Sequence, residues 1–156
     1  MANLKTILVP TDGSEGAQKA AAFAGDIARA TGAKVLILTV QDEEEIIQYA
    51  WGAGDAATAT PYAQMPIEDI RGMLDNRARG KELPDTVAAV GELEEPPESL
   101  VEWGHPVGEI CRIAKERDVD MIVIGSHGRS GFARVVLGSV SNAVANQAPC
   151  PVTVVR

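Results

Sequence analysis

The chain has 156 residues, a length that suits one folded domain with a sizeable core. Hydrophobic residues make up 46% and charged residues 23%, and the formal net charge of −8 argues against nucleic acid or acidic membranes as partners. No apolar run approaches the roughly eighteen residues of a membrane span, and the polar start does not resemble a signal peptide. We therefore expect a single domain over residues 1–156, without membrane insertion, in the cytoplasm.

The first third of the chain predicts a strand, a helix and a second strand. Residues 5–12 are an apolar run that ends in Pro-Thr-Asp, and residues 34–40 are a second apolar run. Between them lies an Ala-rich helix with Ser14 as its N-cap and Gly32 as its stop. Such a unit has parallel strands and a right-handed crossover. Helical spacing predicts a buried face formed by Ala20, Phe23, Ala24, Ile27 and Ala28.

The middle of the chain has a weaker pattern. Residues 41–66 lack a clear period and predict a mobile loop, with room for one helical turn at 43–50. Residues 67–74 show helical spacing, which we expect to break at Gly80 and Pro84 before a short helical piece at 85–90. A short strand follows at 98–104.

Alternation returns in the last third. We expect a helix within 104–120, a buried strand at 120–125, a helix or helix pair within 130–149 and a final strand at 151–156. Five strands that alternate with about four helices predict an α/β fold with a doubly wound parallel sheet. Cys111 and Cys150 match no metal or redox spacing, so we interpret them as buried small hydrophobic residues.

The charge of the last segment differs from that of the rest. Residues 125–156 contain no Asp or Glu, so all 22 acidic residues lie before Gly125. A segment of this kind either meets an anion or is simply a mostly buried helix and strand, and its charge alone favours neither.

Glycines and serines follow the strand predicted at 120–125. Glycines at such a turn let N–H groups approach an anion and permit positive φ, and the start of the next helix attracts phosphate. Ser126, Ser130, Ser139, Ser141 and Arg129 add further donors. The chain has no Gly-Lys-Ser/Thr triplet, and its glycines follow the wrong strand for a dinucleotide fingerprint, so we reject both of those sites.

The spacing Gly125-x2-Gly128-x9-Gly138-Ser139, together with "ILVPTDGS" and "CPVTVV", closely resembles the universal stress protein family in its nucleotide-binding branch. The resemblance covers residues 4–40 and 104–156. It implies a Rossmann-like fold of the adenine nucleotide alpha hydrolase type, with five parallel strands in the order 3-2-1-4-5 and helices on both faces. It also implies a homodimer paired through the strand at 151–156.

The resemblance further implies a site for ATP, or for AMP or ADP. Asp12 would hold the ribose, Val40 would meet the adenine edge, and the segment 138–141 would donate to the phosphates. Mg or Mn would be held by phosphates and water, with no protein metal site and no catalytic residue. The implied binding residues are Pro10, Thr11, Asp12, Val40, Ile124, Gly125, Gly128, Arg129, Gly138, Ser139, Val140 and Ser141.

Several residues keep a simpler interpretation beside the functional one. Asp12 either holds a ribose or makes a helix cap or Asx-turn, and His127 is interpreted as a loop residue near the phosphates. The acidic run 42–45 is interpreted as a solvated helix start, and the aromatic residues of the loop, Tyr49, Trp51 and Tyr62, as surface residues.

Three functions fit this pattern. The first is a nucleotide-dependent stress sensor with little turnover, which we favour because the cradle lacks a recognisable general base. The second is a slow ATPase or self-phosphorylating enzyme that uses the clustered serines. The third is an interaction or chaperone module in which the nucleotide is only a structural ligand.

Overall fold

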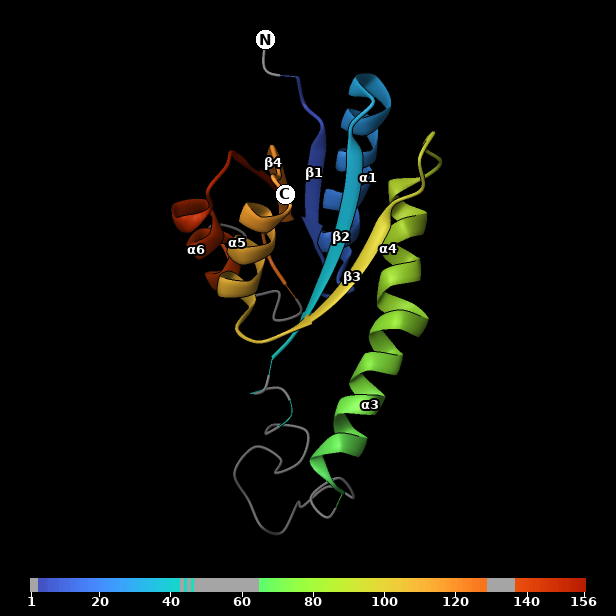
Figure 1. Ribbon diagram of the computed structural model, residues 1–156, viewed down its shortest axis with the longest axis vertical. Coiled ribbons are helices and arrows are strands. Elements are labelled where there is room, and N and C mark those ends of the chain that lie inside the picture. The colour runs from blue at the N-terminus through green and yellow to red at the C-terminus, as the bar shows by residue number, and fades with distance from the viewer. Residues whose placement is uncertain (1–2, 43, 45, 47–64, 129–136) are drawn as a thin grey trace.

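A parallel β-sheet forms the centre of the molecule (Figure 1). The computed structural model describes residues 3–42, 44, 46, 65–128 and 137–156. Five strands lie side by side in the order β3-β2-β1-β4-β5, and each pair is parallel, which confirms the predicted fold class and strand order. The strands are β1 (Thr6–Pro10), β2 (Lys34–Gln41), β3 (Glu98–Trp103), β4 (Met121–Gly125) and β5 (Val152–Val155).

Helices cover both faces of the sheet (Figure 1). On one face, α1 (Glu15–Thr31) and α4 (Leu83–Val90) bury small and branched residues against β1, β2 and β4. On the other face, α5 (Pro106–Glu116) and α6 (Ser139–Gln147) cover a second apolar cluster that contains Leu8, Leu36 and Ile122. No helix in the described part of the chain is both long and apolar enough to cross a membrane.

Helix α1 has the predicted ends but a different buried face. The Ser14 side chain accepts a hydrogen bond from the Ala17 N–H at 3.2 Å, and Gly32 ends the helix with a φ of +76°. Phe23 is 42% exposed, so its predicted place in the core was wrong. The buried face instead follows the side of α1 that packs closely on α4, where a Cβ on Gly25 would stand 2.1 Å from the Val90 carbonyl oxygen, and Phe23, two residues from Gly25, lies on another side of the helix. The buried face consists of Ala17, Ala20, Ala21, Ala24, Gly25 and Ala28.

The predicted helix break at Gly80 and Pro84 was wrong. Helix α3 (Ile67–Arg77) continues through the π-helical segment η3 (Ala78–Glu82) into α4 without leaving helical backbone angles. In η3 the Leu83 N–H donates to the Ala78 carbonyl, five residues back. This change of hydrogen-bonding pattern leaves Pro84 in the first turn of α4, where its missing N–H costs nothing.

The predicted loop 41–66 begins later than expected, because β2 extends through Gln41. The Gln41 side chain is buried and donates to the Leu74 carbonyl of α3 at 3.2 Å. Of the possible helical turn at 43–50, only Glu44 and Ile46 are described, and both are helical. Residues 47–64, with all three aromatic residues of the predicted loop, lie outside the described residues.

The two cysteines are half-buried rather than fully buried, and both are free thiols. They pack against the apolar cluster under α5 and α6. Burial raises the pKa of both thiols, so each stays protonated at neutral pH. This environment agrees with their interpretation as small apolar residues.

Asp120 joins the start of β1 to the start of β4. Its Oδ2 accepts hydrogen bonds from the backbone N–H groups of Lys5 and Thr6, both at 2.9 Å. These two hydrogen bonds favour the carboxylate and lower the pKa of Asp120. Its contribution to stability is therefore complete above the ordinary titration range of an aspartate and is lost as the pH falls through the folded-state pKa.

We expect Asp120→Asn to make stability less dependent on pH. An asparagine still accepts hydrogen bonds but carries no charge, so the wild type should be more stable at pH 7 and lose that advantage below about pH 4. Urea unfolding from pH 7 to pH 3 measures the difference. Asp118→Asn, a change at an exposed neighbour, is the control and should show no such trend. A gap between wild type and Asp120→Asn that is constant with pH would contradict this role.

Candidate functional site

A cleft of about 370 Å³ opens at the carboxyl ends of β1, β2 and β4. In a doubly wound sheet this is where ligands bind, because the strand order reverses there. Of the predicted site residues, Arg129 lies outside the described residues. All the others line the cleft: Pro10, Thr11, Asp12, Val40, Ile124, Gly125, Gly128, Gly138, Ser139, Val140 and Ser141.

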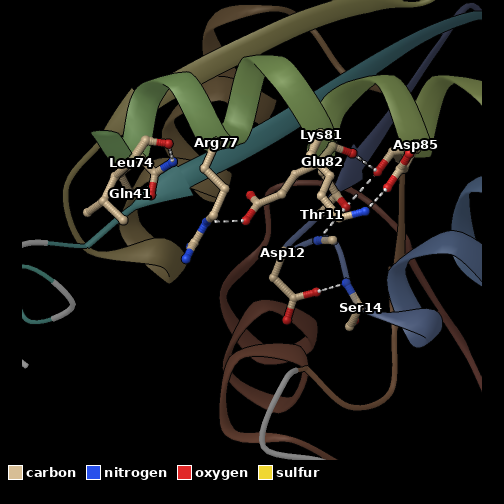
Figure 2. Close-up of polar contacts among 11 residues, drawn as sticks. Thr11, Asp12, Ser14, Gln41, Leu74, Arg77, Lys81, Glu82 and Asp85 are labelled. Carbon is tan, nitrogen blue, oxygen red and sulfur yellow. Dashed lines mark hydrogen bonds and ion pairs between the residues drawn. The ribbon is translucent and has the colours of Figure 1, made fainter. Parts of the chain in front are cut away.

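Asp12 forms the turn that leads from β1 into α1. Its Oδ1 accepts a hydrogen bond from the Ser14 N–H at 2.9 Å, which is an Asx-turn (Figure 2). Ser14 rather than Asp12 caps the helix. The other carboxylate oxygen, Oδ2, faces Gly128, where a Cβ would stand only 2.7 Å away. The Asx-turn therefore exists and orients the carboxylate toward the glycine-rich loop.

The motif glycines serve close backbone contact rather than unusual backbone angles. A Cβ on Gly125 would stand 2.7 Å from the Gly16 carbonyl carbon, and one on Gly138 would stand 3.1 Å from the Ser126 carbonyl oxygen. None of Gly125, Gly128 and Gly138 has a positive φ, so the freedom of glycine to adopt such angles is not used at these three positions. What the motif requires is the absence of a side chain at each of these contacts.

The start of α6 is fixed against the end of β4. The Gly138 N–H donates to the Ser126 carbonyl at 2.7 Å, and the Ser141 hydroxyl lies 3.0 Å and 3.1 Å from the carbonyls of Gly125 and Ser126. The hydroxyl proton of Ser141 is thus used inside the protein. No side chain of the described residues caps α6, so its first-turn N–H groups and the positive end of its dipole lie at the cleft.

Two further polar groups in the cleft wall have no hydrogen-bond partner among the described residues. They are the buried Nε2 of His127 and the buried hydroxyl of Thr39. His127 Nδ1 lies 3.0 Å from the Ser126 hydroxyl, which holds the ring in place. Buried polar groups are nearly always satisfied, so both suit contact with a ligand or water. His127 was predicted near this loop, whereas the prediction did not include Thr39.

Helix α4 and segment η3 form a wall that the sequence did not reveal (Figure 2). A chain of hydrogen bonds runs from the Gly13 N–H to the Thr11 hydroxyl at 3.1 Å, then to the Thr86 hydroxyl at 2.9 Å and to the Glu82 carbonyl at 2.7 Å. The Glu82 side chain is 7% exposed, lines the cleft and forms an ion pair with Arg77 at 3.1 Å.

No local pattern in the sequence marks this wall, because two of the six residues in its buried row, Glu82 and Thr86, are polar. Buried residues recur every four positions from Ile70 to Val90, and four residues overshoot a turn of α-helix by about 40°. A straight α-helix cannot keep such a row on one face for twenty residues, whereas the wider π turn brings the row back. The row consists of Ile70, Leu74, Ala78, Glu82, Thr86 and Val90.

The remaining wall is apolar. Val40 and Leu38 of β2, Ile124 of β4, and Pro106 and Ile110 of α5 line this part of the cleft. The cleft therefore combines N–H donors at α6, carboxylate acceptors near β1 and an apolar surface between α5 and β2. This arrangement suits a ligand with an anionic end and a flat, partly apolar body.

The fold is that of an α/β protein with a cleft at the switch point of its sheet, the place where proteins of this fold class bind ligands. The chain belongs to the Universal stress protein family, because the family's sequence model matches residues 3–156. It is 30% identical to universal stress protein MJ0531 of Methanocaldococcus jannaschii, over 97% of this chain and 82% of that protein.

Two solved structures of universal stress proteins have the same fold as this chain. UspA from Lactobacillus plantarum superposes with a TM-score of 0.77 at 28% identity, and the match covers 100% of both chains. A universal stress protein in complex with cAMP superposes with a TM-score of 0.60 at 28% identity, over 99% of this chain and 98% of that one.

We expect Ser141→Ala to lower the free energy of unfolding by about 1–2 kcal/mol, because two buried carbonyls lose a hydroxyl donor. Ser139→Ala is the matched control: Ser139 is exposed at the start of the same helix, so the change should cost less than about 0.5 kcal/mol. Urea unfolding of both variants measures this. Equal effects would mean that Ser141 does not hold the loop.

Proposed function

We propose that this protein binds an adenine nucleotide in the cleft and acts as a nucleotide-dependent regulator with little turnover. The observation that carries the proposal is the joining of the glycine loop to the uncapped start of α6. Backbone N–H groups at a helix start, beside a glycine-containing loop that allows close approach, form a site for phosphate. The residues proposed to hold the nucleotide are those predicted from the sequence, with His127 and Thr39 in addition.

The other walls support the same ligand. The apolar surface of Val40, Ile110 and Ile124 offers a place for a flat base, and Asp12 offers carboxylate oxygens to ribose hydroxyls. A structural relative at 28% identity is described in complex with cAMP, which is also an adenine nucleotide. We propose ATP as the ligand, with AMP and ADP as the other adenine nucleotides to be compared.

Mg or Mn in this proposal accompanies the phosphates. The described residues contain no group of three His, Cys, Asp or Glu side chains that would hold a metal ion. Phosphate oxygens and water would therefore supply most of the ligands, as is usual for Mg²⁺ on nucleotides.

We also propose a homodimer in the cytoplasm. Strand β5 lies at the edge of the sheet, and all four of its residues are only half-buried, which supports pairing with a second copy through residues 151–156. Free thiols such as those of Cys111 and Cys150 are typical of a reducing compartment.

The test begins with the purified protein. We expect heat denaturation to release an adenine nucleotide that mass spectrometry identifies, and calorimetric titration of stripped protein to give one site per chain. Gly128→Val should weaken binding at least about tenfold, or 1.4 kcal/mol, because its Cβ would stand 2.7 Å from Asp12 Oδ2. Gly72→Ala, in α3 with open space around it, is the control and should bind normally.

The same samples test turnover. We expect no phosphate release from ATP by the wild type above the level of the Gly128→Val variant. Release that follows the wild-type protein through purification would favour the enzyme hypothesis instead. Absence of both released nucleotide and binding in the titration would refute the proposed function.

A further inference from the structure

We infer that Glu82 is a specificity-determining residue of the cleft, which makes the site accept adenosine nucleotides with free ribose hydroxyls and reject those with a second phosphate on the ribose. The inference rests on the proposed function. It concerns the wall formed by η3 and α4, which none of the sequence motifs includes.

The cleft has opposite electrostatic character at its two ends. The end at α6 has backbone N–H groups, serine hydroxyls and His127, and residues 125–156 contain no acidic side chain. Three carboxylates line the rest of the cleft, those of Asp12, Asp42 and Glu82. Among the described residues of the lining there is no lysine or arginine. A phosphate is therefore favoured at one end only.

Glu82 lies close to the turn that holds Asp12. A Cβ on Gly13, the residue after Asp12, would stand 2.9 Å from Glu82 Cγ, so the turn after β1 and the segment η3 are in contact. The hydrogen bonds from Thr11 to Thr86 and from Thr86 to the Glu82 carbonyl hold the turn and the helix in register. A ribose at Asp12 would consequently meet a second carboxylate, the one from η3.

Glu82 lines the cleft, whereas Arg77, with which it forms an ion pair, does not. Arg77 Nε is 3.1 Å from Glu82 Oε1, and Arg77 is not among the residues that line the cleft (Figure 2). Glu82 as a whole residue is only 6% exposed, so water screens its charge poorly. A ligand at the ribose position therefore meets the negative member of the pair first.

Ribose hydroxyls and ribose phosphates respond to this wall in opposite ways. A hydroxyl donates a hydrogen bond to a carboxylate, whereas a phosphate can only accept and carries like charge. The wall thus selects 5′-phosphorylated adenosine with free 2′ and 3′ hydroxyls. It selects against adenosine 2′,5′-bisphosphate and adenosine 3′,5′-bisphosphate, and against larger ligands that contain them.

The experiment is direct calorimetric titration of the full chain, because fluorescent labels on the ribose would alter the group under test. Wild-type protein should bind 5′-AMP at least about tenfold more tightly than either bisphosphate at low salt. Raising NaCl from about 50 mM to about 500 mM should reduce that preference, since screening weakens repulsion.

Three variants separate the effect of the Glu82 charge on this preference from that of the Arg77 charge. Glu82→Gln keeps the shape of the side chain and should reduce the preference for 5′-AMP about threefold or more. The double variant Arg77→Gln/Glu82→Gln also removes the guanidinium that pairs with Glu82 and should still show a reduced preference. Asp85→Asn is the matched control, one turn further along and ion-paired with Lys81 at 3.0 Å, and it should keep the wild-type preference.

Each outcome decides the inference. Equal binding of 5′-AMP and the bisphosphates by the wild type would overturn it, as would a wild-type preference in Glu82→Gln. A double variant that returns to the wild-type preference would assign the effect of the single variant to the charge of Arg77 and would also overturn the inference. Wild-type protein that binds none of these nucleotides refutes the proposed function itself.

Discussion

The geometry of the cleft depends on close contact between two backbone segments that contain glycine. The start of α1 and the loop after β4 meet at Gly16 and Gly125, and a Cβ on Gly16 would stand 2.8 Å from the His127 carbonyl oxygen. Since β1 and β4 are neighbours at the switch point, this contact brings the Asp12 turn against Gly128 and the start of α6. A side chain at either glycine would separate the two segments and open the cleft.

The opposite wall depends on a change of helical pitch. The row of buried residues from Ile70 to Val90 stays on one side because η3 corrects the drift of a regular α-helix. As a result α3 can bury Leu74 against Gln41 of β2 while Glu82 reaches the turn after β1. The π turn thus places a charged residue in the cleft without a loop, which keeps the wall rigid.

The parts that could be predicted from the sequence are those set by local signals. Apolar runs predicted the strands, Ser14 and Gly32 predicted the ends of α1, and the glycine spacing located the loop of the cleft. The errors arose where tertiary packing overrides local preference. Phe23 fits a helical period with Ala20 and Ala24 but lies on a different side of α1 from Gly25, which packs against α4, and Pro84 looks like a helix breaker until the π turn is known. Glu82 had no local signal, because its position in the cleft wall depends on packing against Gly13, far away in the sequence.

The charge of the last segment separates two interpretations that the sequence left open. If residues 125–156 lacked acids because they were mostly buried, α6 and β5 would be inaccessible. Instead, only Ser141 and Val144 are buried among residues 137–156, and α6 exposes Ser139, Asn142 and Gln147. An exposed helix without a single charge is unusual in a chain of net charge −8. Burial therefore does not explain the absence of acids in this segment. Their absence is consistent with an anionic ligand at the start of α6, where Ser139, Val140 and Ser141 line the cleft.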